Sequence, residues 1–117
     1  MNQLTIIGNL TRDPETRETS AGDVTDFTVA VNKRDDADFF RVSVWGDIGA
    51  NCAKYLSKGS KVAVIGSVSA HAYMTKDGDP AASLDVSAVR VEFLNSKQDD
   101  QDNSPRNSKN NSRYNRK

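Results

Sequence analysis

Residues 39–45 read Phe-Phe-Arg-Val-Ser-Val-Trp, and this stretch gives the clearest structural signal in the chain. Successive side chains of a β-strand point to opposite faces. One face of a strand here carries an apolar set that is typical of a core, namely Phe40, Val42 and Val44. The other face carries Phe39, Arg41, Ser43 and Trp45. An ordinary surface strand would present only polar side chains there.

The second face of this strand has two interpretations. Exposed aromatic side chains interleaved with a cation are typical of a surface on which nucleic-acid bases stack. The same residues also fit a sheet that is buried on both faces, in which Phe39 and Trp45 would contact a second packed layer. The stretch alone leaves both interpretations open.

Further elements are predicted on both sides of this strand. Apolar residues that alternate with period two predict four more strands. These span residues 4–10, 24–31, 61–73 and 83–93. A short helix is predicted over 47–57, because apolar residues recur there at helical spacing and Gly59 suits a helix end. Five strands with one helix between the third and the fourth is the order of an OB-fold, so we predict an all-β, five-stranded barrel of that kind.

The apolar residues divide the chain into two parts. Every Leu, Ile, Val and Phe lies at or before Leu94. Residues 1–94 are therefore expected to form one folded domain, and residues 95–117 a disordered polar tail with a basic distal end. For that basic end two roles stay open, which are added electrostatic affinity for a nucleic acid and plain solvation.

The composition argues against several classes of protein. No stretch reaches the roughly 18 apolar residues of a membrane span, and the N-terminus lacks the pattern of a signal peptide, so we expect a cytoplasmic protein without membrane contact. Cys52 and His71, the only cysteine and histidine, cannot supply four zinc ligands. No metal or other cofactor is expected. The carboxylates lie mostly in predicted loops, which does not favour a nuclease, and we expect no enzymatic activity.

Four segments of the chain resemble the bacterial and phage single-stranded DNA-binding proteins. The segments are residues 1–15, 39–46, 55–62 and 89–94, in the order in which that family has them. The resemblance implies an OB-fold homotetramer that binds single-stranded DNA without reading its sequence. It also implies a role in protecting that DNA during replication, recombination or repair, at the nucleoid.

The resemblance assigns DNA-binding roles by position. The aromatic side chains that match the family's base-stacking positions are Phe39, Trp45 and Tyr73. Two cations, Arg41 and Lys58, match basic positions along its DNA path, and the polar loop before the aromatic strand adds Lys33 and Arg34. For these cations the alternatives are plain solvation or, for Arg41, an ion pair with a neighbouring acid.

The first strand is expected to pair subunits. Ile7 lies on the face opposite to the strand's core set, and a strand edge of this kind is a ready pairing surface. A tetramer formed by pairing of sheets from neighbouring subunits would use it.

The chain also departs from the family pattern. Ser69, Ala70 and His71 stand where basic residues are common in the family, so the predicted DNA path carries less positive charge. Bacterial members usually end in an acidic tip closed by Pro-Phe, whereas residues 113–117 read Arg-Tyr-Asn-Arg-Lys, and protein partners are left unassigned. The alternative function is an OB-fold module that binds RNA or a replication partner and has weak affinity for DNA.

Overall fold

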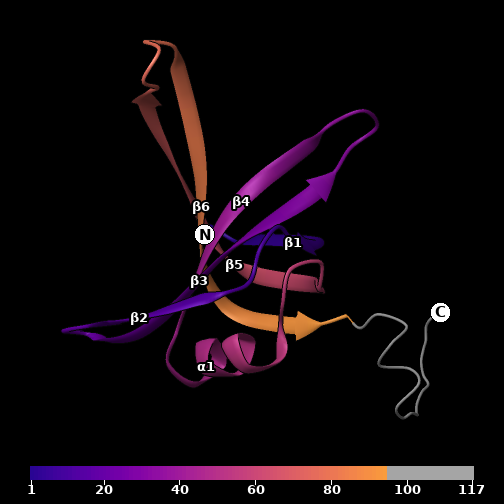
Figure 1. Ribbon diagram of the computed structural model, residues 1–117, viewed down its shortest axis with the longest axis vertical. Coiled ribbons are helices and arrows are strands. Elements are labelled where there is room, and N and C mark those ends of the chain that lie inside the picture. Colours follow the sequence, from indigo (N-terminus) through magenta and orange to yellow (C-terminus); the bar gives the residue numbers. More distant parts are fainter. Residues whose placement is uncertain (95–117) are drawn as a thin grey trace.

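The computed structural model describes residues 1–94, whose strands form a curved sheet that closes around an apolar interior (Figure 1). In chain order the elements are β1 (Leu4–Leu10), β2 (Glu15–Thr19), β3 (Gly22–Asn32), β4 (Ala37–Trp45), α1 (Gly46–Tyr55), β5 (Lys61–Met74) and β6 (Pro80–Phe93). The strand order is β1-β5-β6-β4-β3-β2, and a short further pairing of β1 with β3 closes the barrel. The predicted all-β barrel with one short helix is confirmed.

Strand β2 adds a sixth strand to the five that were predicted. It has the sequence Glu-Thr-Arg-Glu-Thr, which contains no apolar residue and so shows no period-two pattern. The segment is a strand because it pairs with a neighbour: β2 lies antiparallel to β3 along its whole length. Side chains support this pairing, with the Thr16 and Thr25 hydroxyl oxygens 2.9 Å apart and Arg17 Nε donating to Asp26 Oδ2 at 2.7 Å.

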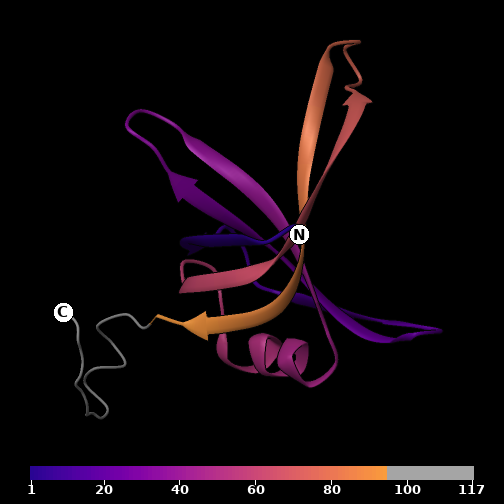
Figure 2. The same ribbon diagram turned by 180° about the vertical axis from the view of Figure 1, so that it is seen from behind.

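Two long hairpins give the molecule its outline. The β3–β4 and β5–β6 hairpins project from the same side of the barrel, and α1 lies at the opposite side, as Figures 1 and 2 both show. Beyond the hairpins, β4 and β6 pair in parallel from Phe40 opposite Leu84 to Val44 opposite Ala88. This parallel pairing brings the aromatic strand beside a segment more than forty residues further along the chain.

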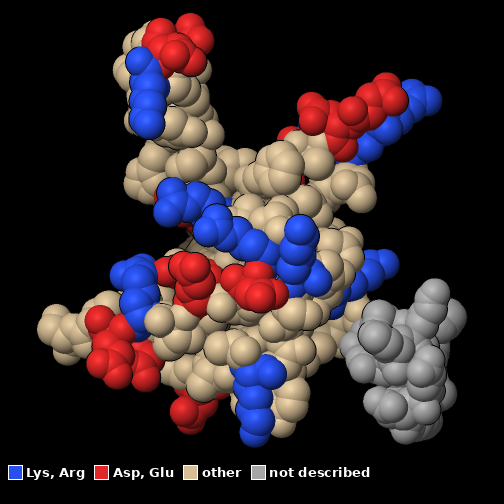
Figure 3. Space-filling view, viewed as in Figure 1, with Lys and Arg blue, Asp and Glu red and all other residues tan. Residues whose placement is uncertain are grey.

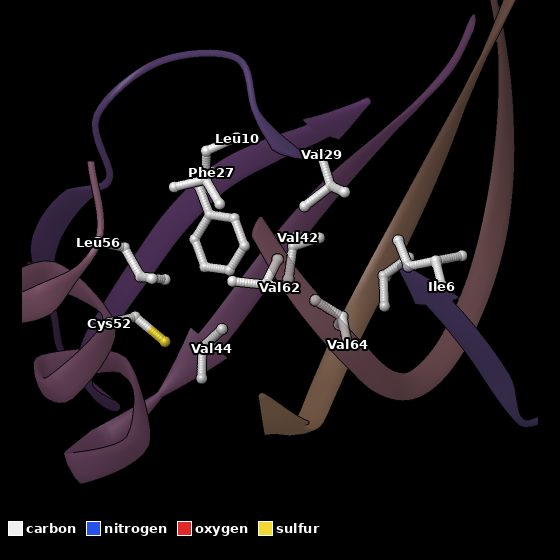
Figure 4. Packing of buried hydrophobic residues seen from close by; sticks show 11 residues of the cluster. Ile6, Leu10, Phe27, Val29, Val42, Val44, Cys52, Leu56, Val62 and Val64 are labelled. Atoms are coloured by element: carbon white, nitrogen blue, oxygen red, sulfur yellow. The ribbon is translucent and has the colours of Figure 1, made fainter. Parts of the chain in front are cut away.

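The core is built from the faces that alternation predicts. Val42 and Val44 are each 1% exposed, and Phe40 packs against the same cluster from a partly buried position. Figure 4 shows Phe27 in this cluster, together with Cys52 and Leu56 from the helical segment. The helix therefore covers one end of the barrel with its apolar side.

Gly8 allows β1 to close the barrel against β3. A Cβ atom built at Gly8 would lie 2.2 Å from the Ala30 carbonyl oxygen, which is far inside any real contact. The pairing of β1 with β3 follows directly, at Asn9 and Leu10. Only a residue without a side chain permits so close an approach of two backbones.

Cys52 is expected to be chemically inert in the folded protein. Its side chain is fully buried, and this burial raises the pKa of its thiol to about 11. Since an unfolded cysteine has a pKa of about 8.5, this group stabilises the fold below that pH and its contribution falls as the pH rises towards 11. At pH 8 an aromatic disulfide reagent should react slowly with native protein and quickly in denaturant. Equal rates in both conditions would contradict the burial.

No helix within residues 1–94 is long and apolar enough to cross a membrane. Over the same residues, no three His, Cys, Asp or Glu side chains are grouped as metal ligands would be. Residues 95–117, for which the sequence predicts a disordered tail, lie outside the described part of the chain.

Candidate nucleic-acid interface

The aromatic strand presents one uncovered face to solvent. Phe39 and Trp45 are 57% and 46% exposed, and Arg41 between them is also exposed. Residues 1–94 place no second layer over this side of β4, so within the described chain the face is not part of a sheet buried on both sides. We call it the outer face, defined by Phe39, Arg41, Ser43 and Trp45 of β4 and by their neighbours in register on β3 and β6.

The register extends the outer face to the β5–β6 hairpin. Asp85 lies opposite Arg41 on β4 and opposite Ser69 on β5. Tyr73 is four residues beyond Ser69 on β5, so it belongs to the same face, and it is 51% exposed. The structure thus brings the three predicted stacking residues onto one continuous side of the sheet.

Acidic side chains on the outer face hold two of its cations. Asp26 accepts hydrogen bonds from Arg17 Nε at 2.7 Å and from Ser43 Oγ at 2.9 Å. The hydrogen bond and the charge of Asp26 both raise the pKa of the Arg17 guanidinium above its usual value. On β6, Asp85 Oδ1 lies 3.9 Å from Arg41 Nε. The ion pair that was the alternative role for Arg41 is therefore present, though it is long.

Asp85 has a second neighbour. Its Oδ2 lies 3.1 Å from His71 Nε2 on β5, so this carboxylate stands between two basic side chains from two different strands. In Figure 3 a band of Lys and Arg side chains crosses the middle of the molecule, with Asp and Glu side chains beneath it.

A polar depression lies beside the aromatic row. Its volume is about 480 Å³. We call it the polar pocket, and its charged lining residues are Arg12, Asp13, Glu15, Arg17, Asp26, Arg41 and Asp85. Acids and arginines thus line it together.

The other predicted cations lie at its margins. The Lys58 backbone N–H donates to Asp13 Oδ1 at 2.8 Å, which places Lys58 next to the turn that borders the polar pocket. Lys33 and Arg34 lie instead at the tip of the β3–β4 hairpin, where Lys33 Nζ is 3.2 Å from Asp38 Oδ1. The seven predicted residues therefore form a row along the outer face with two outlying groups of cations.

Sequence reasoning missed four residues of this surface, which are Arg12, Arg17, Asp26 and Asp85. Arg17 lies on β2, a polar strand that the period-two pattern of apolar residues could not reveal. The two acids appear in sequence as ordinary surface charges, since their partners come from other strands. On β3, Asp26 and Thr28 alternate with the apolar Phe27 and Val29, and this alternation was the available signal that Asp26 faces outward.

Comparisons with known proteins point to one family. Residues 1–94 match the family described as the single-strand binding protein family. The chain is 34% identical over 108 residues to single-stranded DNA-binding protein 1 of Clostridium acetobutylicum, an alignment that covers 85% of this chain and 98% of that protein. It is 37% identical over 108 residues to single-stranded DNA-binding protein 1 of Staphylococcus aureus strain MSSA476, covering 86% of this chain and 69% of that protein.

A solved structure confirms the fold. The crystal structure of a small single-stranded DNA-binding protein from Streptomyces coelicolor superposes with a TM-score of 0.70, covering 78% of this chain and 92% of that one. The two sequences are 23% identical, so this likeness establishes the OB-fold architecture alone.

Proposed function

Because the chain belongs to the single-strand binding protein family, we propose that it binds single-stranded DNA without a fixed recognition sequence and protects it during replication, recombination or repair. The observation that carries this proposal is the uncovered aromatic row on β4, with Phe39 and Trp45 on either side of Arg41. The role is non-enzymatic, and its place is at the nucleoid in the cytoplasm. Residues 1–94 would act as the DNA-binding domain, with 95–117 as an accessory tail.

The aromatic row explains a preference for single strands. Every base has a flat face that can stack on an aromatic ring, and each such stack contributes about 1–3 kcal/mol. Phe39 and Trp45 are six residues apart on one strand, about 20 Å, so they would stack on separate bases. Tyr73 would offer a third platform on the β5–β6 hairpin. Paired bases in a duplex do not present their faces, so a duplex would bind poorly.

The cations would contact phosphates around this row. Arg41 is held by Asp85 only at 3.9 Å, and exposed ion pairs of this kind contribute about 0–1 kcal/mol. Arg41 can therefore exchange Asp85 for a phosphate at little cost. Lys58 would contact the strand near the polar pocket, and Lys33 and Arg34 would contact it at the tip of the β3–β4 hairpin.

Titration of the single tryptophan tests the proposal. Trp45 lies within the proposed site, so an oligo-dT strand should quench its fluorescence and a matching duplex should not. Affinity should fall with salt, with a log–log slope of at most about −3 per subunit if each of the four predicted cations neutralises one phosphate at about −0.7 each. Affinity that ignores salt, or a preference for the duplex, would exclude this mechanism.

The runner-up function is binding of RNA or of a replication partner. The observation that favours it is the acidity of the hairpin tip, where Asp35, Asp36 and Asp38 follow the cations Lys33 and Arg34 and weaken their attraction for DNA phosphates. The same titration with an RNA oligomer separates the two functions. Tighter binding of RNA than of DNA would favour the runner-up.

We also propose that the protein assembles as a homotetramer through β1 and β5. Ile7 is 52% exposed, and it lies opposite Ala63 and next to Ile65 on the outward side of these two strands. Within the described chain, β1 has a second partner strand only at Asn9 and Leu10, so most of its other edge is open. Apolar side chains beside an open strand edge favour pairing with another subunit.

Light scattering at micromolar concentration should give the mass of four chains. Ile7→Asp should lower that mass, because it would bury an unpaired charge between subunits. Ile48→Asp is the matched control, since Ile48 is 42% exposed on α1, away from this surface. A wild-type protein that is monomeric, or two variants that assemble alike, would contradict the proposed interface.

A further inference from the structure

The centre of the outer face carries carboxylates, which a surface for a polyanion does not need. The side chains of Asp26 and Asp85 are 36% and 33% exposed, and both line the polar pocket beside the aromatic row. Each lies next to an arginine, so neither is explained as an isolated surface charge. The two carboxylates differ, however, in how many of their oxygens are free to accept a hydrogen bond from a ligand.

The two carboxylates differ in how far their acceptor capacity is used. Both oxygens of Asp26 accept short hydrogen bonds, from Arg17 and from Ser43. Asp85 Oδ2 is close to His71, but Oδ1 faces Arg41 Nε at 3.9 Å, which is too long for a hydrogen bond. Asp85 Oδ1 therefore has no hydrogen-bond donor within residues 1–94, whereas both oxygens of Asp26 are engaged within the protein.

Asp85 lies within reach of a base that stacks on the aromatic row. It is the register partner of Arg41, and Phe39 is two residues from Arg41 on the same side of β4, about 7 Å away. A base on Phe39 would extend its edge over this neighbouring position. The polar pocket, at about 480 Å³, has the size of sites that take small molecules.

The lining of the pocket suits a nucleotide better than a free anion. Arginines such as Arg12 and Arg41 can bind a phosphate, but carboxylates line the same depression and would repel one. A nucleotide can bind both the arginines and the carboxylates. Its phosphate accepts hydrogen bonds from guanidinium groups, and an amino group of its base can donate one to a carboxylate. Carboxylates are known acceptors for the amino group of cytosine.

Given the proposed function, on which this inference rests, we propose that Asp85 is a specificity-determining residue. Its Oδ1 accepts a hydrogen bond from the exocyclic amino group of a base stacked on Phe39. Cytosine and thymine allow a clean comparison of a base that presents an amino group with one that does not, because both bases have a single ring. Cytosine presents an amino group at the position where thymine presents a carbonyl oxygen, which a carboxylate would repel. Cytosine is therefore bound more tightly than thymine.

The test compares oligo-dC with oligo-dT, titrated against the full chain and followed by Trp45 fluorescence. One net hydrogen bond changes affinity by about two- to tenfold, so wild-type protein should favour oligo-dC by a factor in that range. Asp85→Ala should bind both oligomers with equal affinity. Asp26→Ala is the matched control, since it removes one carboxylate of similar exposure from the same face and should keep the preference.

The outcomes separate this inference from the proposed function. At low salt Asp26→Ala should raise affinity for both oligomers, because it removes a negative charge from a face that meets phosphates. Asp85→Ala should raise affinity for oligo-dT more than for oligo-dC, because for oligo-dC it also removes the hydrogen bond. A wild-type ratio at or below one, a ratio that survives in Asp85→Ala, or a ratio that Asp26→Ala abolishes equally would overturn the role of Asp85. Absence of binding to both oligomers would instead refute the proposed function. Thermal melting of both variants checks that the fold is intact.

Discussion

Replacing Phe39 and Trp45 together by alanine should lower affinity for single-stranded DNA by about 2–6 kcal/mol, which is the sum of two stacking contributions of about 1–3 kcal/mol. The sum is justified because the two rings are about 20 Å apart on β4 and share no contact, and distant sites usually act independently. Since the variant has no tryptophan, the measurement is the anisotropy of a labelled oligomer. The loss should appear as faster dissociation.

Tyr55→Ala is the control for this pair. Tyr55 is a similarly large aromatic residue, 62% exposed, but it lies on α1 and not on the outer face. It should leave affinity unchanged. The double variant should keep its thermal transition, although Trp45 lies opposite the buried Val24 and its removal should lower the melting temperature slightly. Loss of the transition would show that these rings are core residues, and unchanged affinity would show that they do not stack on bases.

Phe27→Ala should destabilise the protein by about 3–5 kcal/mol, whereas Phe39→Ala should leave its stability nearly unchanged. Phe27 is 4% exposed in the middle of the barrel core, so its removal leaves a cavity that neighbouring valines cannot fill. Whole domains are stable by only about 5–15 kcal/mol, so a large part of the total would be lost. Urea unfolding followed by Trp45 fluorescence measures the change.

The comparison of the two phenylalanines separates fold from function. The same substitution is made on two adjacent strands, once inside the barrel and once on its outer face. Phe27→Ala should shift the unfolding midpoint and, at low temperature where the protein stays folded, bind DNA as wild type does. Phe39→Ala should do the opposite. The structure indicates that the core and the outer face are independent. If each variant changed both the unfolding midpoint and the DNA affinity, that independence would be contradicted.

Alternation along β4 was sufficient to predict both faces of this strand. Phe40, Val42 and Val44 point inward and Phe39 and Trp45 outward, because a strand has a fixed period of two and the apolar residues obey it. Whether the outward aromatics were covered could not be predicted. That depends on what the rest of the chain places over them, which a local pattern does not contain.

Features that depend on register between distant strands could not be predicted. Asp85 meets Arg41 only because β4 and β6 pair in parallel, and a shift by one residue would turn Asp85 to the other side of the sheet. Arg17 meets Asp26 through β2, a strand whose sequence has no apolar residue to reveal it. The charge balance of the site thus follows from tertiary pairing, whereas its aromatic row follows from local pattern.

The pairing of β1 determines when the barrel can form during folding. Residues from Leu4 to Asn9 find their main partners between Lys61 and Gly66, so most of the chain must be present before β1 has a neighbour along its length. Contacts of such long sequence separation are slow to form, and barrels built from them typically fold in milliseconds to seconds. On the ribosome, β1 leaves the exit tunnel before β5 and stays without that partner until β5 follows. A strand synthesised well before its main partner is therefore among the last to take its native place.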